Sequence, residues 1–328
     1  MKAIICKNYG DIDELEFLDV DTPDCKDNEV LISVAACGVN FPDTLIVQGK
    51  YQFKPNPPFS PGGEVSGVIK KVGANVENFK IGDKVIAFTT WGGFAEEISI
   101  NQTKVLKIPD TFDLIDAAGF VLTYGTSYHA LFDRAQFSEG ETILVLGASG
   151  GVGLAAIQLS KIQGLKVIAA ASTDNKLNIC KENGADFLIN YKDDDIRKKV
   201  KEFTQGQGVD VIYDPVGGEL SEIVVRDMKW NGRYLVVGFA AGTIPKLPLN
   251  LPLLKGCSIV GVFWGSFTEK ESTKNFQNNQ KLFELYKDNK LKPHIHKVFP
   301  LKDAIDALKE LQSQKVSGKV ILKTDNLD

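Results

Sequence analysis

The sequence predicts an α/β protein with a β-barrel-like domain and a doubly wound domain built on a parallel sheet. Two observations support this prediction. Short β-rich runs closed by glycine or proline fill the first third of the chain, and from Glu141 onward apolar strands alternate with helices. The first pattern is typical of a barrel, and the second of a parallel sheet covered on both faces. The 328 residues are enough for two such domains.

The first domain is expected to hold short strands followed by helices. Residues 29–36, 63–69 and 83–88 have the composition of strands, and each run is followed by glycine, proline or polar residues. Near Asp113 the pattern changes, and residues 113–118 and 127–134 are expected to be helical.

The second domain is expected to begin with the unit strand 142–146, helix 152–161, strand 166–170 and helix 176–183. Its strands are almost entirely apolar, as in a parallel sheet buried on both sides. The later strands are expected at 186–189, 209–213, 232–237 and 258–262.

The chain is expected to return to the first domain after Phe263. Helices at 280–289 and 301–313 and a strand at 319–322 form a tail too short for a third domain. We therefore expect residues 1–121 and 264–328 to form the first domain, and residues 122–263 to form the second.

Composition argues against several classes of protein. The 38 basic and 42 acidic residues give a net charge of −4, so no basic field favours nucleic acid or an anionic membrane surface. No run approaches the roughly 20 apolar residues of a spanning helix. The five cysteines are scattered without a CxxC pair, which argues against a disulfide framework and favours a reduced, cytoplasmic setting.

A glycine-rich turn between a predicted strand and a predicted helix is the sharpest local signal. It comprises Gly147, Gly150, Gly151 and Gly153, spaced G-x-x-G-G-x-G with one residue more than the usual dinucleotide fingerprint. Glycines allow the backbone to approach a pyrophosphate, and the helix N-terminus supplies N–H donors to it. We expect Ser149, Gly150, Gly151 and Val152 to bind a dinucleotide here.

The end of the next strand indicates which dinucleotide binds. Enzymes that use NAD place an acidic residue there to hold the ribose hydroxyls. This chain has Ser172 and, one turn later, Lys176, which suit the 2′-phosphate of NADPH. Tyr191 is a further candidate contact, and Asp174 is expected to cap the following helix.

Several motifs in this order resemble the zinc-free quinone oxidoreductase branch of the medium-chain dehydrogenase/reductase superfamily. They are ACGVNFPD at 36–43, PGGEVSG at 61–67, GGFAE at 92–96, the glycine turn at 147–153, and DPVG at 214–217. The resemblance covers essentially the whole chain. It implies a GroES-like catalytic domain, a Rossmann domain that binds NADPH, and reduction of a small electron-poor acceptor such as a quinone or an enone.

Metal ligands are missing where zinc-dependent relatives carry them. Those relatives have a cysteine at the position of Asn40 and a histidine at the position of Gly63. Neither an amide nor a glycine replaces such a ligand around tetrahedral zinc. His294 and His296 are two residues apart, but no acidic or cysteine partner is evident nearby. We therefore expect no metal site.

The resemblance also suggests which residues act. It implies that Asn40 lies near the nicotinamide ribose and the substrate, where its amide would orient a carbonyl, and that Tyr51 lies in the substrate cleft. An asparagine that merely satisfies its own turn, or a surface tyrosine, is the alternative in each case. Asp43 is expected to be structural. The further cofactor contacts that the resemblance implies are Thr123, Val216, Gly238, Phe239, Phe263, Trp264 and Lys319, the last near the 2′-phosphate or the cleft.

Two other functions stay open at this point. An enoyl-thioester reductase would use the same scaffold, and Lys50 and Lys54 beside Tyr51 are compatible with a CoA substrate. A non-catalytic NADPH-binding protein is the alternative outside the enzymes. Leu45 stands where some quinone reductases have a tyrosine, which weakens the assignment of quinone as the substrate. The apolar stretch 257–264 is expected to be an edge strand that pairs across a homodimer.

Overall fold

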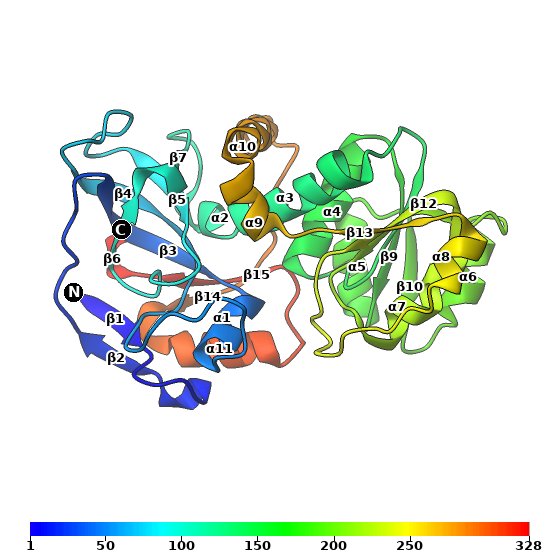
Figure 1. The fold of residues 1–328 in the computed structure, drawn as a ribbon, viewed down its shortest axis with the longest axis horizontal. Coiled ribbons are helices and arrows are strands. Elements are labelled where there is room, and N and C mark those ends of the chain that lie inside the picture. Colours follow the sequence, from blue (N-terminus) through cyan, green and yellow to red (C-terminus); the bar gives the residue numbers. More distant parts are fainter. Residues whose placement is uncertain (328) are drawn as a thin grey trace. The chain divides into compact units, whose positions relative to one another are not determined.

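The computed structural model describes residues 1–327, which divide into two compact units. Among the described residues, unit 1 comprises residues 1–122 and 293–327, and unit 2 comprises residues 123–292. The predicted fold class is confirmed: a mostly antiparallel β unit accompanies a unit built on a parallel sheet (Figure 1). No helix in the described part of the chain is long and apolar enough to cross a membrane.

Unit 1 is built around a seven-stranded sheet in which β3 is the longest strand. Strands β15 and β4 flank β3, β6 also pairs with it, and β1 pairs with β2 in a separate two-stranded sheet. Side chains of β3, β4, β5 and β15 contribute to its apolar core, together with residues of α1, α11 and the connecting segments. The strands are β1 (Lys2–Ile5), β2 (Glu16–Asp19), β3 (Glu29–Val39), β4 (Glu64–Val72), β5 (Lys84–Phe88), β6 (Glu97–Asn101), β7 (Val105–Lys107), β14 (Ile295–Pro300) and β15 (Lys319–Lys323).

Three α-helices accompany this sheet. Asn40 precedes the first of them, and Pro42 stands in its first turn, where a missing N–H costs nothing. The side chain of Asp113 accepts hydrogen bonds from the N–H groups of Ile115 and Asp116 and so caps the second. The helices are α1 (Phe41–Val47), α2 (Leu114–Ala118) and α11 (Ala304–Gln312), with 3-10 turns η1 (Ile12–Glu14), η2 (Gln102–Lys104), η5 (Leu301–Asp303) and η6 (Asp325–Leu327).

Unit 2 contains a six-stranded parallel sheet in the order β10-β9-β8-β11-β12-β13. In chain order this is 3-2-1-4-5-6, the arrangement of dinucleotide-binding domains, in which the order reverses beside β8. Strand β8 is completely buried and β9 almost completely, whereas the edge strand β13 is largely exposed. They are β8 (Thr142–Val145), β9 (Lys166–Ala171), β10 (Phe187–Asn190), β11 (Val209–Asp214), β12 (Met228–Val236) and β13 (Ser258–Gly261).

Helices alternate with these strands, and α4 and α5 contact β8, β9 and β10. The helix expected at 127–134 starts earlier, at Val121, and continues from His129 as a wider π-helix. The helices are α3 (Val121–Tyr128), the π-helix η3 (His129–Ala135), α4 (Gly151–Ile162), α5 (Asp174–Glu182), α6 (Ile196–Phe203), α7 (Gly218–Val224), the 3-10 turn η4 (Val225–Asp227), α8 (Asn250–Lys255), α9 (Trp264–Lys270) and α10 (Ser272–Lys287).

The chain returns to unit 1 later than expected, at Pro293 instead of residue 264. The reason is that α9 and α10 pack on α3 and η3 within unit 2. The ring of Phe267 stacks on that of His129 at 3.9 Å, and the side chains of Lys274 and Asn278 reach the carboxylate of Asp133 at 3.1 and 2.9 Å. These contacts join residues far apart in sequence, so the helical pattern alone gave no sign of them.

Candidate functional site

The glycine-rich turn connects the end of β8 to the start of α4. Gly147 has φ +55°, and a Cβ there would lie 2.7 Å from the side chain of Val216. A Cβ at Gly153 would lie 2.6 Å from the carbonyl oxygen of Gly147. Both positions therefore need glycine, the first for the turn and the second for the close approach of the helix.

The N-terminus of α4 has no side-chain cap, which leaves its first-turn N–H groups available to an anion. Its N-cap residue, Gly150, has no side chain to bond the first-turn N–H groups. Such N–H groups, together with the helix dipole, form an anion-binding site. Ser149, Gly150, Gly151 and Val152 all lie at this position, as the sequence predicts for pyrophosphate contacts.

The residues expected around the dinucleotide gather at the carboxyl end of the parallel sheet. The N–H of Ala148 donates to the carbonyl of Ala170 at 3.1 Å, which joins the glycine turn to β9. Ser172 follows β9, Tyr191 follows β10 and Val216 follows β11. Ligands of doubly wound proteins bind at this edge, where the strand order reverses.

The helix after β9 is capped differently from the prediction. Thr173 is the N-cap of α5, and its hydroxyl accepts a hydrogen bond from the N–H of Lys176 at 3.4 Å. Asp174, the expected cap, is the first helical residue, and its carboxylate accepts a hydrogen bond from the Asn190 amide at 3.0 Å. The prediction was wrong because either residue type can cap a helix, and the hydroxyl lies one residue earlier.

Lys176 has a cationic neighbour that sequence reasoning missed. Burial lowers the pKa of the half-buried Lys176, and repulsion from Lys192 lowers it further. Lys192 follows Tyr191 directly and so emerges at the same edge of the sheet. Its position in the loop after β10 was the available signal. Two mutually repelling ammonium groups would both be stabilised by a doubly charged phosphate.

A buried carboxylate shapes the loop that carries Val216. One oxygen of Asp214 accepts hydrogen bonds from the N–H groups of Val216 and Gly217 at 2.8 and 2.9 Å. The other accepts them from the hydroxyls of Ser221, at 2.5 Å, and Tyr234. Burial beside this carboxylate raises the pKa of Tyr234, so that the phenol remains a donor. Asp214 thereby fixes the backbone that follows β11.

The remaining expected contacts in unit 2 differ in exposure. Thr123 is buried in α3, whereas Phe263 and Phe239 are 48% and 38% exposed. A Cβ on Gly217 would lie 2.9 Å from the ring of Phe239, which places that ring over the same loop as Val216. Gly238 also follows this sheet edge, and its N–H donates to the carbonyl of Asp214 at 3.2 Å.

Trp264 has a packing role in the structure. Its side chain is buried, and a Cβ on Gly125 of α3 would lie 2.8 Å from the indole ring. The resemblance implies that both Phe263 and Trp264 contact the cofactor. The structure separates them, since the first side chain is exposed and the second packs α9 against α3.

In unit 1, Asn40, Glu64 and Lys319 meet at the ends of three adjacent strands. β3 pairs with β4 and β15, and Gly38 lies opposite both Glu64 and Ile321. The ammonium of Lys319 is 2.5 Å from Oδ1 of Asn40 and 3.2 Å from Oε2 of Glu64. Residues expected near substrate and cofactor thus belong to one buried network within this unit.

Asp43 contacts Asn40, and its charge acts on Tyr51. The N–H of Asn40 donates to the Asp43 carboxylate at 2.7 Å, which fixes the start of α1 and confirms a structural role for Asp43. Burial raises the pKa of Asp43 to about 7. Burial also raises the pKa of Tyr51, and the charge of Asp43 adds to that shift, so the Tyr51 phenol remains protonated at neutral pH.

Metal ligands do not gather in the described part of the chain. Among residues 1–327, no three His, Cys, Asp or Glu side chains come together as a metal site. His296 does have an acidic neighbour that the sequence did not reveal, with Nε2 3.3 Å from the carboxylate of Glu310. This pair lacks a third ligand of those four residue types.

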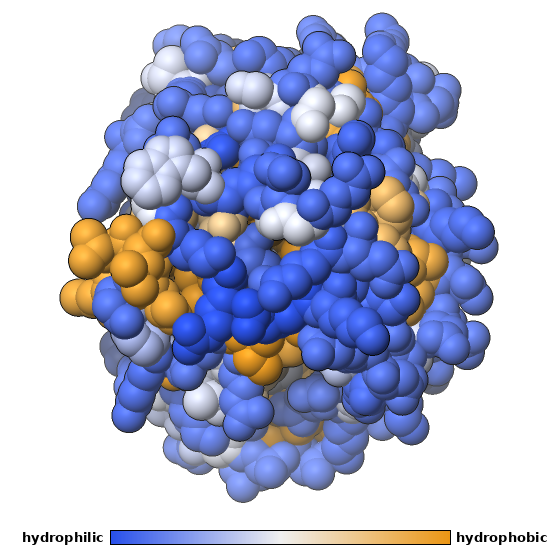
Figure 2. Space-filling model, turned by 90° about the vertical axis from the view of Figure 1, so that its right-hand side faces the viewer, coloured by the Kyte–Doolittle hydropathy of each residue, from blue (hydrophilic) through white to orange (hydrophobic). Residues whose placement is uncertain are grey.

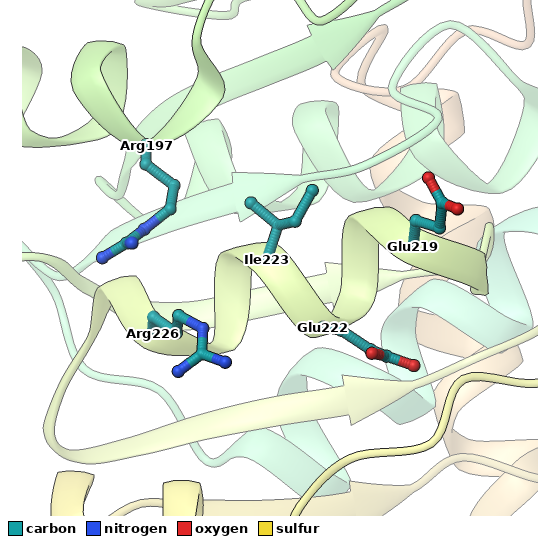
Figure 3. Close-up of a pocket in the computed structure, with 5 residues that line it drawn as sticks. All are labelled: Arg197, Glu219, Glu222, Ile223 and Arg226. Carbon is teal, nitrogen blue, oxygen red and sulfur yellow. The ribbon is translucent and has the colours of Figure 1, made fainter.

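A charged hollow on unit 2 lies apart from the residues predicted to form the site. Its volume is about 440 Å³, and its lining residues are Arg197, Glu219, Glu222, Ile223 and Arg226 on α6, α7 and η4 (Figure 3). Arg197 is bound to the carboxylate of Asp227 at 3.0 Å. The lining comprises two basic and two acidic side chains, and none of its residues is among those predicted to bind the dinucleotide.

Comparisons with known proteins agree with this architecture. Residues 26–110 match the alcohol dehydrogenase GroES-like domain, and residues 151–279 match the family described as zinc-binding dehydrogenase. The chain is 38% identical to a quinone oxidoreductase-like protein 2 homolog of Nematostella vectensis, over 98% of this chain and 89% of that protein.

Two solved structures extend the comparison. The Escherichia coli quinone oxidoreductase, solved in complex with NADPH, matches with a TM-score of 0.91 and 27% identity, covering 98% of this chain and 100% of that one. The CurK enoyl reductase matches with a TM-score of 0.89 and 26% identity, covering 98% and 99%. With its two-unit architecture and its glycine turn, the chain belongs to the quinone oxidoreductase branch of the medium-chain dehydrogenase/reductase superfamily, a group of NAD(P)-dependent oxidoreductases.

Proposed function

We propose that this protein transfers hydride from NADPH to a small, apolar, electron-poor acceptor, a quinone or an enone, without a metal ion. The observation that carries the choice of cofactor is the end of β9, where Ser172 is followed by Lys176 with Lys192 beside it. Two cations and a hydroxyl there favour a 2′-phosphate over free ribose hydroxyls. The related E. coli quinone oxidoreductase was solved with NADPH, which supports the same choice.

The chain fits NADPH through groups that bind and orient it. The open N-terminus of α4 would receive the pyrophosphate, and Lys176 and Lys192 the 2′-phosphate, with Ser172 and Tyr191 beside them. When bound, NADPH supplies the hydride, and the protein supplies position and electrostatics. We assign Asn40, Thr123, Val216, Gly238, Phe239 and Phe263 to the surroundings of the nicotinamide.

Tyr51 is our candidate for the proton donor. Its raised pKa keeps the phenol protonated, so it can donate a hydrogen bond to the acceptor oxygen or a proton after hydride transfer. The Tyr51→Phe variant keeps the ring that packs beside Phe53, at 6.0 Å between ring centroids, and removes only the hydroxyl. We expect it to lower kcat for an enone at least tenfold while leaving NADPH affinity unchanged. Unchanged kcat would remove Tyr51 from the mechanism.

The experiment that tests the function is an acceptor panel followed by NADPH consumption with a chelator present throughout. Turnover of simple quinones or enones, with NADPH used at least tenfold more efficiently than NADH, is the expected result. Equal efficiency with both cofactors would refute the proposed role of the cationic pair. Cofactor binding without consumption of NADPH by any acceptor would instead support a non-catalytic NADPH-binding protein.

An enoyl-thioester reductase is the second candidate. Lys50 and Lys54 are exposed on either side of Tyr51, where they would attract the phosphates of a CoA ester. The likeness to the CurK enoyl reductase favours the same candidate. Including crotonyl-CoA in the acceptor panel separates the two, since a thioester reductase would turn it over faster than any simple quinone.

We also propose that the protein forms a homodimer through the edge of the parallel sheet. The expected edge strand is present as β13, and Ile259 on it is 40% exposed. Nearby in sequence, Leu249, Leu253 and Leu254 at α8 are 83%, 78% and 72% exposed. Figure 2 shows apolar side chains gathered in patches on a surface that is otherwise mostly hydrophilic. Exposed apolar surface beside an open strand edge is typical of an interface.

The mass in solution tests the dimer. Sedimentation should give twice the chain mass of 35.9 kDa. The Leu253→Lys variant should sediment as a monomer, whereas Ile81→Lys, which changes an apolar side chain 67% exposed in unit 1, should not. A wild-type protein that sediments as a monomer at micromolar concentration would overturn the proposal.

A further inference from the structure

The buried ion pair between Lys319 and Glu64 occupies space that two glycines leave free. Lys319 is 5% exposed and Glu64 is fully buried. A Cβ on Gly38 would lie 2.8 Å from Oε2 of Glu64 and 3.1 Å from the Lys319 ammonium, and one on Gly119 would lie 3.2 Å from the Lys319 stem. The local sequence thus accommodates a charged pair inside the sheet. Such a pair is costly to bury, which suggests a purpose other than stability.

The ion pair fixes which way the Asn40 amide points. An ammonium only donates hydrogen bonds, so the amide atom beside Lys319 must be the oxygen Oδ1. The amide nitrogen then faces two acceptors, the Gly38 carbonyl at 3.1 Å and Oε2 of Glu64 at 3.3 Å. Both N–H groups of Asn40 are used, and only a lone pair on Oδ1 is left for a ligand.

The donors of Lys319 are used in the same way. An ammonium has three N–H groups, and Lys319 has three acceptors within 3.5 Å: Oδ1 of Asn40, Oε2 of Glu64 and the carbonyl oxygen of Val39. No donor is left for a phosphate. This arrangement argues against the expected contact between Lys319 and the 2′-phosphate, and for a role that acts through Asn40.

We propose that Glu64 and Lys319 are positioning residues that hold Asn40 as a hydrogen-bond acceptor for a hydroxyl group. The inference rests on the proposed function and deepens it. A carbonyl has no hydrogen to donate, so Asn40 does not orient the acceptor carbonyl. Its partner is a hydroxyl, either on the nicotinamide-bearing ribose of NADPH or on the reduced product.

The test compares the binding of two ligands to a charge-balanced variant. Glu64→Gln combined with Lys319→Met removes both charges together, so no unpaired charge stays buried. The amide oxygen introduced at position 64 can still accept the hydrogen bond that the N–H of Leu122 now donates to Oε1 of Glu64 at 2.8 Å. The first ligand is NADPH. The second, 2′,5′-ADP, carries the adenosine and the 2′-phosphate but no nicotinamide ribose.

For a ribose partner, we expect the double variant to bind NADPH about tenfold more weakly and 2′,5′-ADP with unchanged affinity. Asn40→Leu, which keeps the ion pair and removes the amide, should behave in the same way and serves if the double variant does not fold. Lys176→Met is the matched control, and it should weaken both ligands. For a hydroxyl on the product, the variants should instead weaken the hydroquinone as a product inhibitor and leave both nucleotides unchanged.

Two results would overturn the positioning role. If the double variant lowered the affinity for NADPH and for 2′,5′-ADP equally, Lys319 would be a contact of the 2′-phosphate. If the variants of Asn40, Glu64 and Lys319 all kept the wild-type affinity for NADPH, 2′,5′-ADP and hydroquinone, the Glu64–Lys319 pair would have no role in binding a ligand. Failure of the proposed function is distinct from both, because it would be seen in the wild-type protein itself, which would then either not bind NADPH or reduce no acceptor.

Discussion

Replacing Gly153 with alanine should damage the dinucleotide site and the fold together. The new Cβ would lie 2.6 Å from the carbonyl oxygen of Gly147 and 2.7 Å from that of Ala148. Both atoms belong to the backbone and cannot rotate away, so α4 must move off the turn by about 0.9 Å to restore ordinary contact distances of about 3.5 Å. Overpacking of this kind costs about 1–3 kcal/mol.

The same displacement moves the first-turn N–H groups of α4 away from the position of the pyrophosphate. A loss of 1.4 kcal/mol is about a tenfold change in affinity, so we expect NADPH to bind the Gly153→Ala variant at least tenfold more weakly. Urea unfolding measures the stability, and fluorescence titration with NADPH measures the affinity.

A matched control separates the clash from the general effect of alanine. A Cβ on Gly265, the second residue of α9, would meet nothing closer than 3.5 Å, and alanine favours a helix. Gly265→Ala should therefore unfold at the same urea concentration as the wild type or a higher one. If Gly153→Ala matched the wild type in both stability and NADPH affinity, the close approach of α4 to the turn would not be what positions the cofactor.

Three further predictions concern charge and buried hydrogen bonds. Burial raises the pKa of Asp43 from 3.8 to about 7, so the folded protein holds the carboxyl proton more tightly than the unfolded chain does. The stability that this proton adds is complete below about pH 4 and is lost as the pH rises toward 7, by on the order of 4 kcal/mol. The unfolding free energy of the wild type should therefore fall relative to that of Asp43→Asn over this range, and a constant difference would contradict the shift. Asp214→Asn should lower the melting temperature more than Tyr234→Phe, since it disturbs four hydrogen bonds instead of one; equal losses would show that the carboxylate does not organise the loop. Lys192→Met should weaken NADPH about fivefold and leave NADH unaffected, with the exposed Lys198→Met as control, and a loss shared by both cofactors would exclude a contact with the 2′-phosphate.

The fold class could be predicted because hydrophobic patterns in this chain are local. Nearly continuous apolar runs such as the one beginning at Thr142 form the buried parallel strands, and the glycine turn marks the start of α4. The point of return to unit 1 could not be predicted. It depends on long-range contacts, such as the stacking of Phe267 on His129, that no helical pattern encodes.

The candidate site divides in the same way. The positions of the glycine turn and of the residues after β9 could be predicted, because in each case one strand and the following helix determine them. The environment of Asn40 could not, since Lys319 is 279 residues away and meets it only because β15 pairs with β3. Lys192 and Asp214 were missed for a related reason: their roles depend on which loops share the carboxyl end of the sheet.

The pairing of β15 with β3 also constrains the order of events during synthesis. Strand β3 leaves the ribosome early, but its neighbour β15 follows only after all of unit 2 has been translated. Until then residues 36–39 of β3 lack their β15 partner, and Asn40 lacks the Lys319 ammonium that contacts its side chain. A nascent chain therefore contains a nearly complete nucleotide-binding unit before the Asn40 network can form, because that network needs the last strand.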